Sequence, residues 1–424
     1  MKGRVVLGVL LASFGAFYCY LISAFVIDGH WVLLDDAAIT ARYAYNLTEG
    51  HGLVWNPLEE HPVQGYTSPA WMLYMTFWHL FLPQKLAGFP VLATGALCLL
   101  WTGWLSWKNE SYVGAVAVMA LYPLVFWALR GMETGIQVAL VVACLGTKNK
   151  RASYVLGALA CFTRLDSLPF VLVAGLRNRL AAVGGLIGSG MYVAWSLVFH
   201  GTMFPNSYLL KLGCSLADRV PVGFEIFMGH SLIPALAVLA ACLYTRAWLG
   251  CLLLAGGVAY SVYAGGDFAE MAVAAPNRMM LLGFVPAIVE GFKGSRGGLG
   301  GPAVLAALVI GVAGWAAWLG KEAPLWPNDK LCFERAMILK EQPISRIAAH
   351  GIGHRGYWTG KTVIDCLGRV DGVVAAGPMA AKKYRSGHCK WNYDHSIKEM
   401  KPEVIDDMWP ALGQWLQENG KEEG

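Results

Sequence analysis

Two adjacent carboxylates, Asp35 and Asp36, follow the first long apolar run of the chain. An ionised carboxylate in such a place can accept a proton from a hydroxyl, bind a cation or cap a helix. For an isolated pair of aspartates, the helix cap is the commonest of these roles. Here the pair opens a polar stretch that continues to residue 68, which is longer than a simple connection between helices needs. We therefore expect chemistry at this pair.

The distribution of charge places this polar stretch beside a membrane. Only 14% of the 424 residues are charged, against roughly 25% in a soluble domain. Residues 321–424 hold 29 of the 61 charges, and the first 320 residues hold the other 32. That composition excludes a soluble enzyme, a coiled coil or a disordered chain for residues 1–320. The net charge of +5 comes from clusters between apolar runs, so we expect no nucleic-acid partner.

Apolar runs predict a polytopic α-helical membrane protein with about eleven crossings. The first run, 5–27, follows two positive charges and is longer than the core of a signal peptide, so we interpret it as a membrane helix with a cytoplasmic N-terminus. Clusters of Lys and Arg then place 28–68, 200–221, 265–276 and the tail on the opposite side. The other apolar runs are 69–83, 87–107, 111–129, 134–147, 152–163, 167–176, 180–199, 222–244, 247–264, 277–292 and 300–320.

Two of these regions do not fit a simple alternation of crossings. Segment 69–83 lies between two regions expected on the same side, so we expect it to be interfacial or re-entrant. Arg164 and Asp166 interrupt the apolar stretch 152–176, which predicts two short or broken helices that meet on the outer side.

The tail has the composition of a small soluble domain. Short apolar runs alternate with polar turns after a Pro-marked linker, which predicts an α/β domain over 321–424 that docks over residues 28–68. Helices are expected over 329–341 and 394–400. Under the predicted topology several cysteines face an oxidising compartment, and one disulfide among them is expected. They are Cys332, Cys366, Cys389 and Cys214. The sequence does not identify which two cysteines would pair.

Short motifs in a fixed order carry a family resemblance. The first, in 35–69, reads D-D-A-x-I-T-x-R-Y, then N-L-x-E-G-H-G-L-V-W-N-P, then G-Y-T-S-P. The others are GMET at 131–134, TRLD at 163–166, FPNSYLLK at 204–211, GGDF at 265–268 with Arg278 after it, YWTGKTVIDCLGRVD at 357–371 and SGHCKW at 386–391. Together they resemble the GT-C fold glycosyltransferases. Among these, the chain is most similar to the bacterial arabinofuranosyltransferase group, with the mycobacterial terminal arabinofuranosyltransferases and their pilin-modifying relatives.

The resemblance implies an activity, a place and a fold. The expected enzyme is a multi-pass protein of the bacterial inner membrane, with a GT-C catalytic domain over 1–320 and a periplasmic C-terminal domain over 321–424. It would transfer a sugar, arabinofuranose by this resemblance, from a polyprenyl-phosphate donor to a periplasmic glycan or protein acceptor. The reaction would be inverting, with a carboxylate that deprotonates the acceptor hydroxyl and cations that hold the leaving phosphate.

The motifs assign roles to particular residues. Asp36, and after it Asp35, is the expected base, and no metal ligand or cofactor is predicted, although the acidic pair could hold Ca²⁺ or Mg²⁺. Gln64 stands where the family often has glutamate, and its neutral amide cannot act as a base. The expected phosphate ligands are Arg42, Lys211, Arg278 and Arg164. The expected contacts to substrate are Tyr43, His51, Trp55, Gln64, Tyr66, Asn206 and Asp267.

Each cation also has a structural interpretation. Arg164 could pair with Asp166, Arg278 with Asp267, and Arg42 could lower the pKa of Asp36. Lys211 could be a lysine whose ammonium group extends to the membrane surface. At the level of function the alternatives are a hexose-transferring GT-C enzyme, a transporter or flippase of lipid-linked glycans, and a non-catalytic assembly protein.

Overall fold

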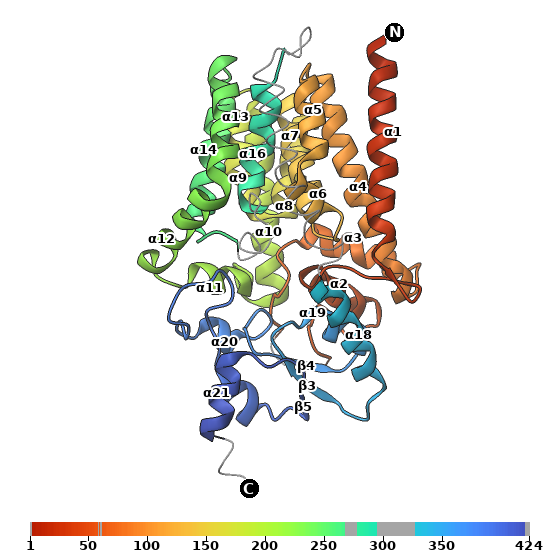
Figure 1. Ribbon diagram of the computed structural model, residues 1–424, viewed down its shortest axis with the longest axis vertical. Helices are drawn as coiled ribbons and strands as arrows, with labels where there is room; N and C mark the ends of the chain where they lie inside the picture. The colour runs from red at the N-terminus through yellow and green to blue at the C-terminus, as the bar shows by residue number, and fades with distance from the viewer. Residues whose placement is uncertain (1, 58, 60–61, 268–277, 295–326, 420–424) are drawn as a thin grey trace.

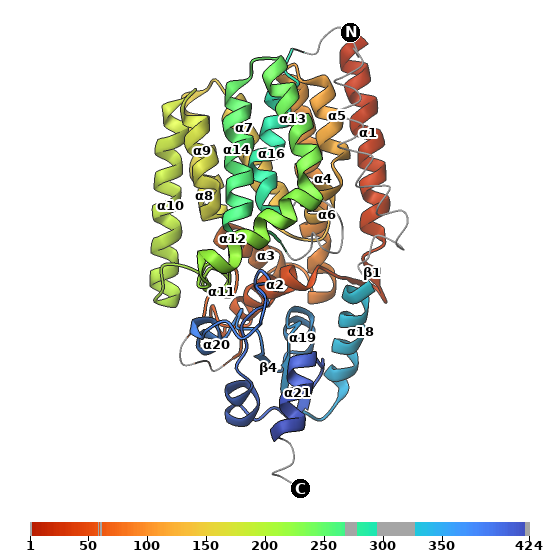
Figure 2. The ribbon, with the colours of Figure 1, turned by 60° about the vertical axis from the view of Figure 1, so that its left-hand side comes forward.

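The computed structural model describes residues 2–57, 59, 62–267, 278–294 and 327–419. This part of the chain is mostly helical, and Figure 1 shows upright helices in one half and a small sheet with shorter helices in the other. Two views show that α2 (Asp35–Thr48) and α3 (Pro69–His79) lie across the end of the upright helices, next to the C-terminal elements (Figures 1 and 2).

Among the described residues, four apolar stretches of helix are long enough to cross a membrane. They are Val5–Ser23 within α1 (Lys2–Ser23), α4 (Gln84–Lys108), α10 (Arg179–His200) and the continuous Leu216–Tyr244. The last comprises α12 (Leu216–Ile226), a π-helix (Phe227–Ser231) and α13 (Leu232–Tyr244). The protein is thus rich in helices suited to a membrane. The number of eleven crossings stays a prediction, and the crossing expected at 300–320 lies outside the described residues.

The remaining helices of this half are shorter. The interruption predicted at Arg164 and Asp166 is present as a single 3-10 turn (Leu165–Ser167) between α8 and α9. Segment 69–83 contains the eleven-residue α3, which is too short to span a bilayer. The bounds are α2 (Asp35–Thr48), α3 (Pro69–His79), α5 (Tyr112–Ala120), α6 (Tyr122–Ala128), α7 (Thr134–Gly146), α8 (Lys150–Thr163), α9 (Leu168–Gly175), α11 (Asn206–Leu212), α14 (Trp248–Tyr263) and α16 (Arg278–Gly291), with the short hairpin of β1 (Val26–Ile27) and β2 (His30–Trp31).

Local chemistry sets where α8 and α10 begin and how closely they pack. The side chains of Asn149 and Asn178 accept backbone N–H groups at the two helix starts. A Cβ atom at Gly184 would lie 2.0 Å from the carbonyl oxygen of Tyr154, and one at Gly188 would lie 2.1 Å from that of Ala158. Because glycines four residues apart leave this space open, the two helix backbones come into contact, as small residues allow in membrane helices.

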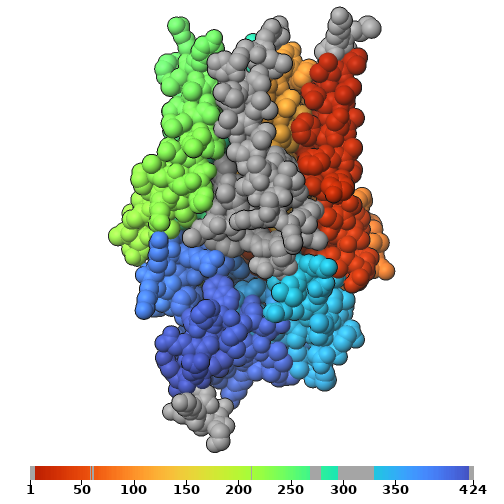
Figure 3. Space-filling model, in the orientation of Figure 1, coloured from red at the N-terminus to blue at the C-terminus, as the bar shows by residue number. Residues whose placement is uncertain are grey.

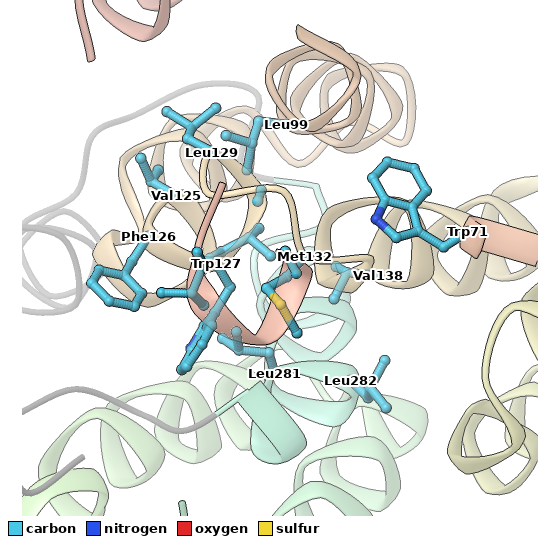
Figure 4. Close-up of a cluster of buried hydrophobic side chains, with 14 of the residues drawn as sticks. Trp71, Leu99, Val125, Phe126, Trp127, Leu129, Met132, Val138, Leu281 and Leu282 are labelled. Carbon is cyan, nitrogen blue, oxygen red and sulfur yellow. The ribbon is translucent and has the colours of Figure 1, made fainter. Parts of the chain in front are cut away.

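The main core lies where α3, α4, α6, α7 and α16 meet. Figure 4 shows Trp71, Leu99, Trp127, Met132 and Leu281 among the buried side chains of this cluster. The Nε1–H group of Trp71 donates to the carbonyl of Gly131, 2.8 Å away, so the aromatic core also fixes the turn before α7. This packed region supports one wall of the cavity described below.

The C-terminal residues form a three-stranded parallel sheet in the order β4-β3-β5, with Ile347 of the central strand opposite Val363 on one side and Val404 on the other. Figure 3 shows these residues packed directly beneath the helical half. The boundary predicted at residue 320 stays a prediction. The elements are α18 (Pro327–Glu341), β3 (Arg346–Ala349), α19 (Gly353–Thr359), β4 (Thr362–Asp365), α20 (Gly372–Ala376), a π-helix (Asp394–Glu399), β5 (Val404–Ile405) and α21 (Pro410–Asn419).

Replacing Gly353 tests whether the start of α19 must touch α2. A Cβ atom there would lie 1.8 Å from the carbonyl oxygen of Asp35, so Gly353→Ala should lower the free energy of unfolding by about 1–3 kcal/mol or more. Denaturation of the purified protein in detergent measures this change. The matched control is Gly190→Ala on the exposed side of α10, where no atom lies within 4 Å of the new methyl group. Equal stability of the two variants would contradict the close approach of α19 to α2.

Candidate functional site

A cavity of about 430 Å³ lies between the ends of the helices and the C-terminal residues. Its wall is assembled from segments far apart in the sequence. The charged side chains among its lining residues come from α2, the turn before α7, the α8–α9 break, α11, the segment after α14, α16 and the loop after β4. They are Asp36, Glu133, Arg164, Asp166, Lys211, Asp267, Arg278 and Arg369. Four carboxylates thus face four cations around one space.

The two adjacent aspartates point to different partners. Asp35 and Asp36 are the first two residues of α2, and neighbouring positions of a helix face different directions. Asp35 Oδ1 accepts the backbone N–H of His354, at 2.9 Å, and so caps the start of α19. Asp36 lines the cavity, with Oδ2 at 3.4 Å from Arg278 Nη2. Asp35 therefore does not cap its own helix but holds the distant α19, while Asp36 faces the space where a substrate could lie.

The cations around Asp36 keep it ionised. Burial raises the pKa of this carboxyl group, but Arg369, Arg278 and Lys211 together lower it to about 2. Arg369 Nη2 lies 3.9 Å from Asp36 Oδ1. Asp36 is consequently an anion at neutral pH, held in the field of two guanidinium groups.

Arg164 and Arg278 have carboxylate partners and also line the cavity. Arg164 contacts Asp166 at 2.6 Å and Glu133 at 2.5 Å, so the ion pair foreseen from the sequence is present. Arg278 Nε lies 3.0 Å from Asp267 Oδ2, as its structural interpretation foresaw. The guanidinium of Arg278 also lies over the ring of Trp127, 4.8 Å from its centre.

Lys211 is the cavity cation whose ammonium group has no hydrogen bond or ion pair within the described parts of the chain. It lies in the last turn of α11, which the backbone N–H of Asn206 ties to the carbonyl of Gln64, at 3.0 Å. Burial first, and then the positive charge of Arg278, lower the pKa of Lys211 to about 8. A charged group without a partner in a polar cavity is available to an incoming anion.

Arg369 and His388 were assigned no role from the sequence, although both lie in motifs that carry the resemblance. Arg369 donates to His388 Nε2, at 2.8 Å, and His388 Nδ1 lies 2.8 Å from the carbonyl oxygen of Ser386. These partners assign the proton of the neutral ring to Nδ1. Burial and the charge of Arg369 lower the pKa of His388 to about 3, so the ring stays neutral.

Hydrogen bonds within the loop after β4 fix the position of Arg369. The carboxylate of Asp365 accepts the backbone N–H groups of Leu367 and Val370, both at 2.8 Å. Gly368 has φ +82°, a conformation that glycine adopts without steric cost. The turn D-x-L-G-R therefore folds back on its own aspartate and leaves the arginine side chain directed at the cavity.

The other predicted substrate residues divide into two groups. Tyr66 and Asp267 line the cavity, and the hydroxyl of Tyr66 is fixed by Trp195 Nε1 at 2.8 Å and His200 Nε2 at 2.9 Å. The rest, with Arg42, lie outside the lining. These are Arg42, Tyr43, His51, Trp55, Gln64 and Asn206.

Most of these outer residues donate hydrogen bonds to backbone carbonyls of other segments and so fix how those segments pack. Arg42 Nε donates to the carbonyl of Trp55, at 3.1 Å, and Trp55 Nε1 donates to that of Val363 in β4, at 2.9 Å. Asn206 Nδ2 donates to the carbonyl of Gly368, at 3.2 Å, which ties α11 to the Arg369 loop. Tyr43 donates to the carbonyl of Val63, at 2.5 Å. His51 is exposed, and Gln64 is buried with no side-chain partner among the described residues.

Within the described residues, no group of three or more His, Cys, Asp or Glu side chains is placed to hold a metal ion. Asp35 and Asp36, the pair considered for Ca²⁺ or Mg²⁺, have separate partners. The chain matches no protein-family model, no curated protein and no solved structure.

Asp35 should matter for stability because its carboxylate caps α19. Asp35→Ala removes this cap and should lower the free energy of unfolding by about 1 kcal/mol. The control is Asp394→Ala, because the side chain of Asp394 is exposed and its pair with Lys398 lies on the surface. Denaturation of both purified variants should show a loss for Asp35→Ala alone, and a loss of the same size in the control would contradict the cap.

Proposed function

We propose that this protein is a membrane glycosyltransferase that transfers a sugar from a polyprenyl-phosphate donor to a hydroxyl of a periplasmic glycan or protein. The observation that carries the proposal is the meeting of Asp36, Lys211 and Arg278 in one cavity beside apolar helices. A carboxylate and several cations are the groups that a sugar transfer with a phosphate leaving group requires. Arabinofuranose is the proposed sugar on the motif resemblance alone.

Asp36 is the proposed base. Its ionised carboxylate faces the cavity and would accept the proton of the acceptor hydroxyl as that oxygen attacks the anomeric carbon, while the bond to the lipid phosphate breaks. A carboxylate with a pKa of about 2 is a weak base, because Arg369 and Arg278 stabilise its charge. A donor phosphate would share these cations and so raise the pKa of Asp36. In this scheme the base gains strength once the donor is bound.

Lys211, Arg278 and Arg369 are the proposed phosphate ligands. Within the described residues Lys211 has no anionic partner to give up, and the two arginines reach the cavity from opposite halves of the protein. Their charges would stabilise the negative charge that grows on the departing phosphate. Arg164 lines the same space, but Glu133 and Asp166 already neutralise it, so we assign it to the cavity wall.

The lipid part of the donor needs an apolar path, and one side of the cavity supplies it. Phe204 and Tyr208 stack with ring centres 4.5 Å apart, and with Leu210 and Tyr263 they line the cavity between α11 and α14. Tyr208 is 39% exposed, so this apolar wall continues to the surface of the protein. The first isoprenoid units would leave the cavity along it.

A transfer assay tests the proposed base. In membranes supplied with a polyprenyl-phosphate-arabinofuranose analogue, Asp36→Asn should reduce transfer by about 10²–10⁴-fold, because the amide cannot accept the proton. The matched control is Asp218→Asn, a change of the same chemistry at an exposed position of α12. Expression and denaturation profiles show whether both variants fold.

The outcomes of this assay separate the functional alternatives. Transfer of a hexose but not of arabinofuranose by the wild type would keep the enzyme class and change the sugar. Full activity of a folded Asp36→Asn variant would overturn the proposed base. Movement of a lipid-linked glycan across the membrane, with no transfer to any acceptor, would favour a transporter.

The pH dependence of donor use tests Lys211. Because its pKa is lowered to about 8, the ammonium group is charged below this pH and neutral above it. The phosphodiester of the donor keeps one negative charge throughout this range, so kcat/KM should fall by roughly tenfold as pH rises through 8. Lys211→Arg keeps the positive charge and should remove this alkaline limb, and an unchanged limb in that variant would assign it to another group.

A further inference from the structure

Two cysteines that are 175 residues apart in the sequence meet next to segments that line the cavity. Cys214 Sγ lies 3.4 Å from Cys389 Sγ, and both residues are buried, with exposed fractions of 8% and 1%. We propose that Cys214 and Cys389 form a disulfide bond that joins the turn after α11 to the segment that carries His388. The proposal rests on the proposed function insofar as that function places these residues in the oxidising periplasm.

The two sulfur atoms already lie in contact, and their segments are held together independently. The hydroxyl of Tyr384 lies 3.1 Å from the carbonyl oxygen of Lys211. Lys390 Nζ donates to the carbonyl of Leu209, at 3.3 Å. These hydrogen bonds keep the two segments together, so bond formation requires only that the sulfurs approach from contact to about 2 Å.

The bond would act on residues that line the cavity. Lys211 precedes Cys214 by three positions, and His388 immediately precedes Cys389, so a covalent link between the cysteines limits the movement of both. The other two tail cysteines lie elsewhere. Cys366 packs in a separate core with Tyr393 and Leu412, and Cys332 lies in α18.

The chemistry requires an oxidant of a defined class. The thiolate of one cysteine attacks the disulfide of a thiol oxidoreductase or of a small-molecule disulfide, and the thiolate of the other then displaces it. The Sγ–Sγ bond forms, the disulfide bond of the oxidant breaks, and two electrons and two protons pass to the oxidant, which is released as its two thiol groups. Since both thiols are buried in the folded protein, we expect the exchange while the chain is folding.

Thiol mapping of the full-length protein tests the bond. Cells are quenched with acid, and free thiols are alkylated in denaturant before digestion without reductant. The expected result is one linked peptide that contains Cys214 and Cys389 and disappears on reduction, with Cys332 and Cys366 alkylated. Alkylation of Cys214 and Cys389 in most molecules, or a link from either to another cysteine, would overturn the proposal.

A second pair of cysteines is the control for the compartment. Cys242 in α13 and Cys251 in α14 flank Arg246, which the charge pattern places on the cytoplasmic side. They should stay reduced in the same sample. A disulfide at Cys242–Cys251 with free thiols at Cys214 and Cys389 would overturn both the proposal and the predicted orientation.

Kinetics test the effect on the cavity separately from the bond. The double variant Cys214→Ser/Cys389→Ser should raise the KM for the donor about threefold, with kcat little changed and no response to reductant. Cys332→Ser should behave as the wild type. An unchanged KM would overturn the role of the bond in shaping the cavity. Because mapping needs no activity, a linked peptide without any transfer would contradict the proposed function and leave the disulfide standing.

Discussion

The ion pairs of Arg278 join the parts of the protein that surround the cavity. This residue begins α16, lies 3.0 Å from Asp267 after α14, and lies 3.4 Å from Asp36 on α2. Charges that are largely shielded from water interact strongly, and the loss of one leaves its partners uncompensated. The same attraction keeps Asp36 charged and weakly basic. In the proposed reaction the donor phosphate would give the cations a second anionic partner, which would raise the pKa of Asp36 and make it a stronger base.

Much of the motif-rich segment 35–69 attaches the C-terminal sheet to the helical half of the protein. Arg42 and Trp55 end on backbone carbonyls, and the indole N–H of Trp55 reaches the sheet through Val363. Arg130, beyond this segment, forms a buried ion pair with Asp329 of α18 at 3.2 Å. The cavity is therefore shaped by contacts that hold the C-terminal residues against the helices. The motifs of this segment therefore contain residues that fix the position of the C-terminal residues as well as residues that face the cavity.

The sequence predicted the helical membrane character, the break at Arg164 and several residues that share the cavity, because apolar length and ordered motifs are local properties. It could not separate Asp35 from Asp36, since only the start of α19, some 320 residues later, captures one of them. Nor could it give Arg369 and His388 roles, because a turn held by Asp365 decides where the arginine points. The sulfur contact depends on the same long-range packing.

The position of Arg369 and His388 in chain order has a consequence for biosynthesis. Both residues follow the apolar helices, whereas Asp36 follows the first of them. During synthesis on the ribosome, the helices that carry Asp36, Lys211 and Arg278 exist before the wall opposite them. A nascent chain therefore holds an open cavity until the segments with Arg369 and His388 have been made and packed. A product that ended before residue 369 would keep Asp36, Lys211 and Arg278 but would lack the wall opposite them.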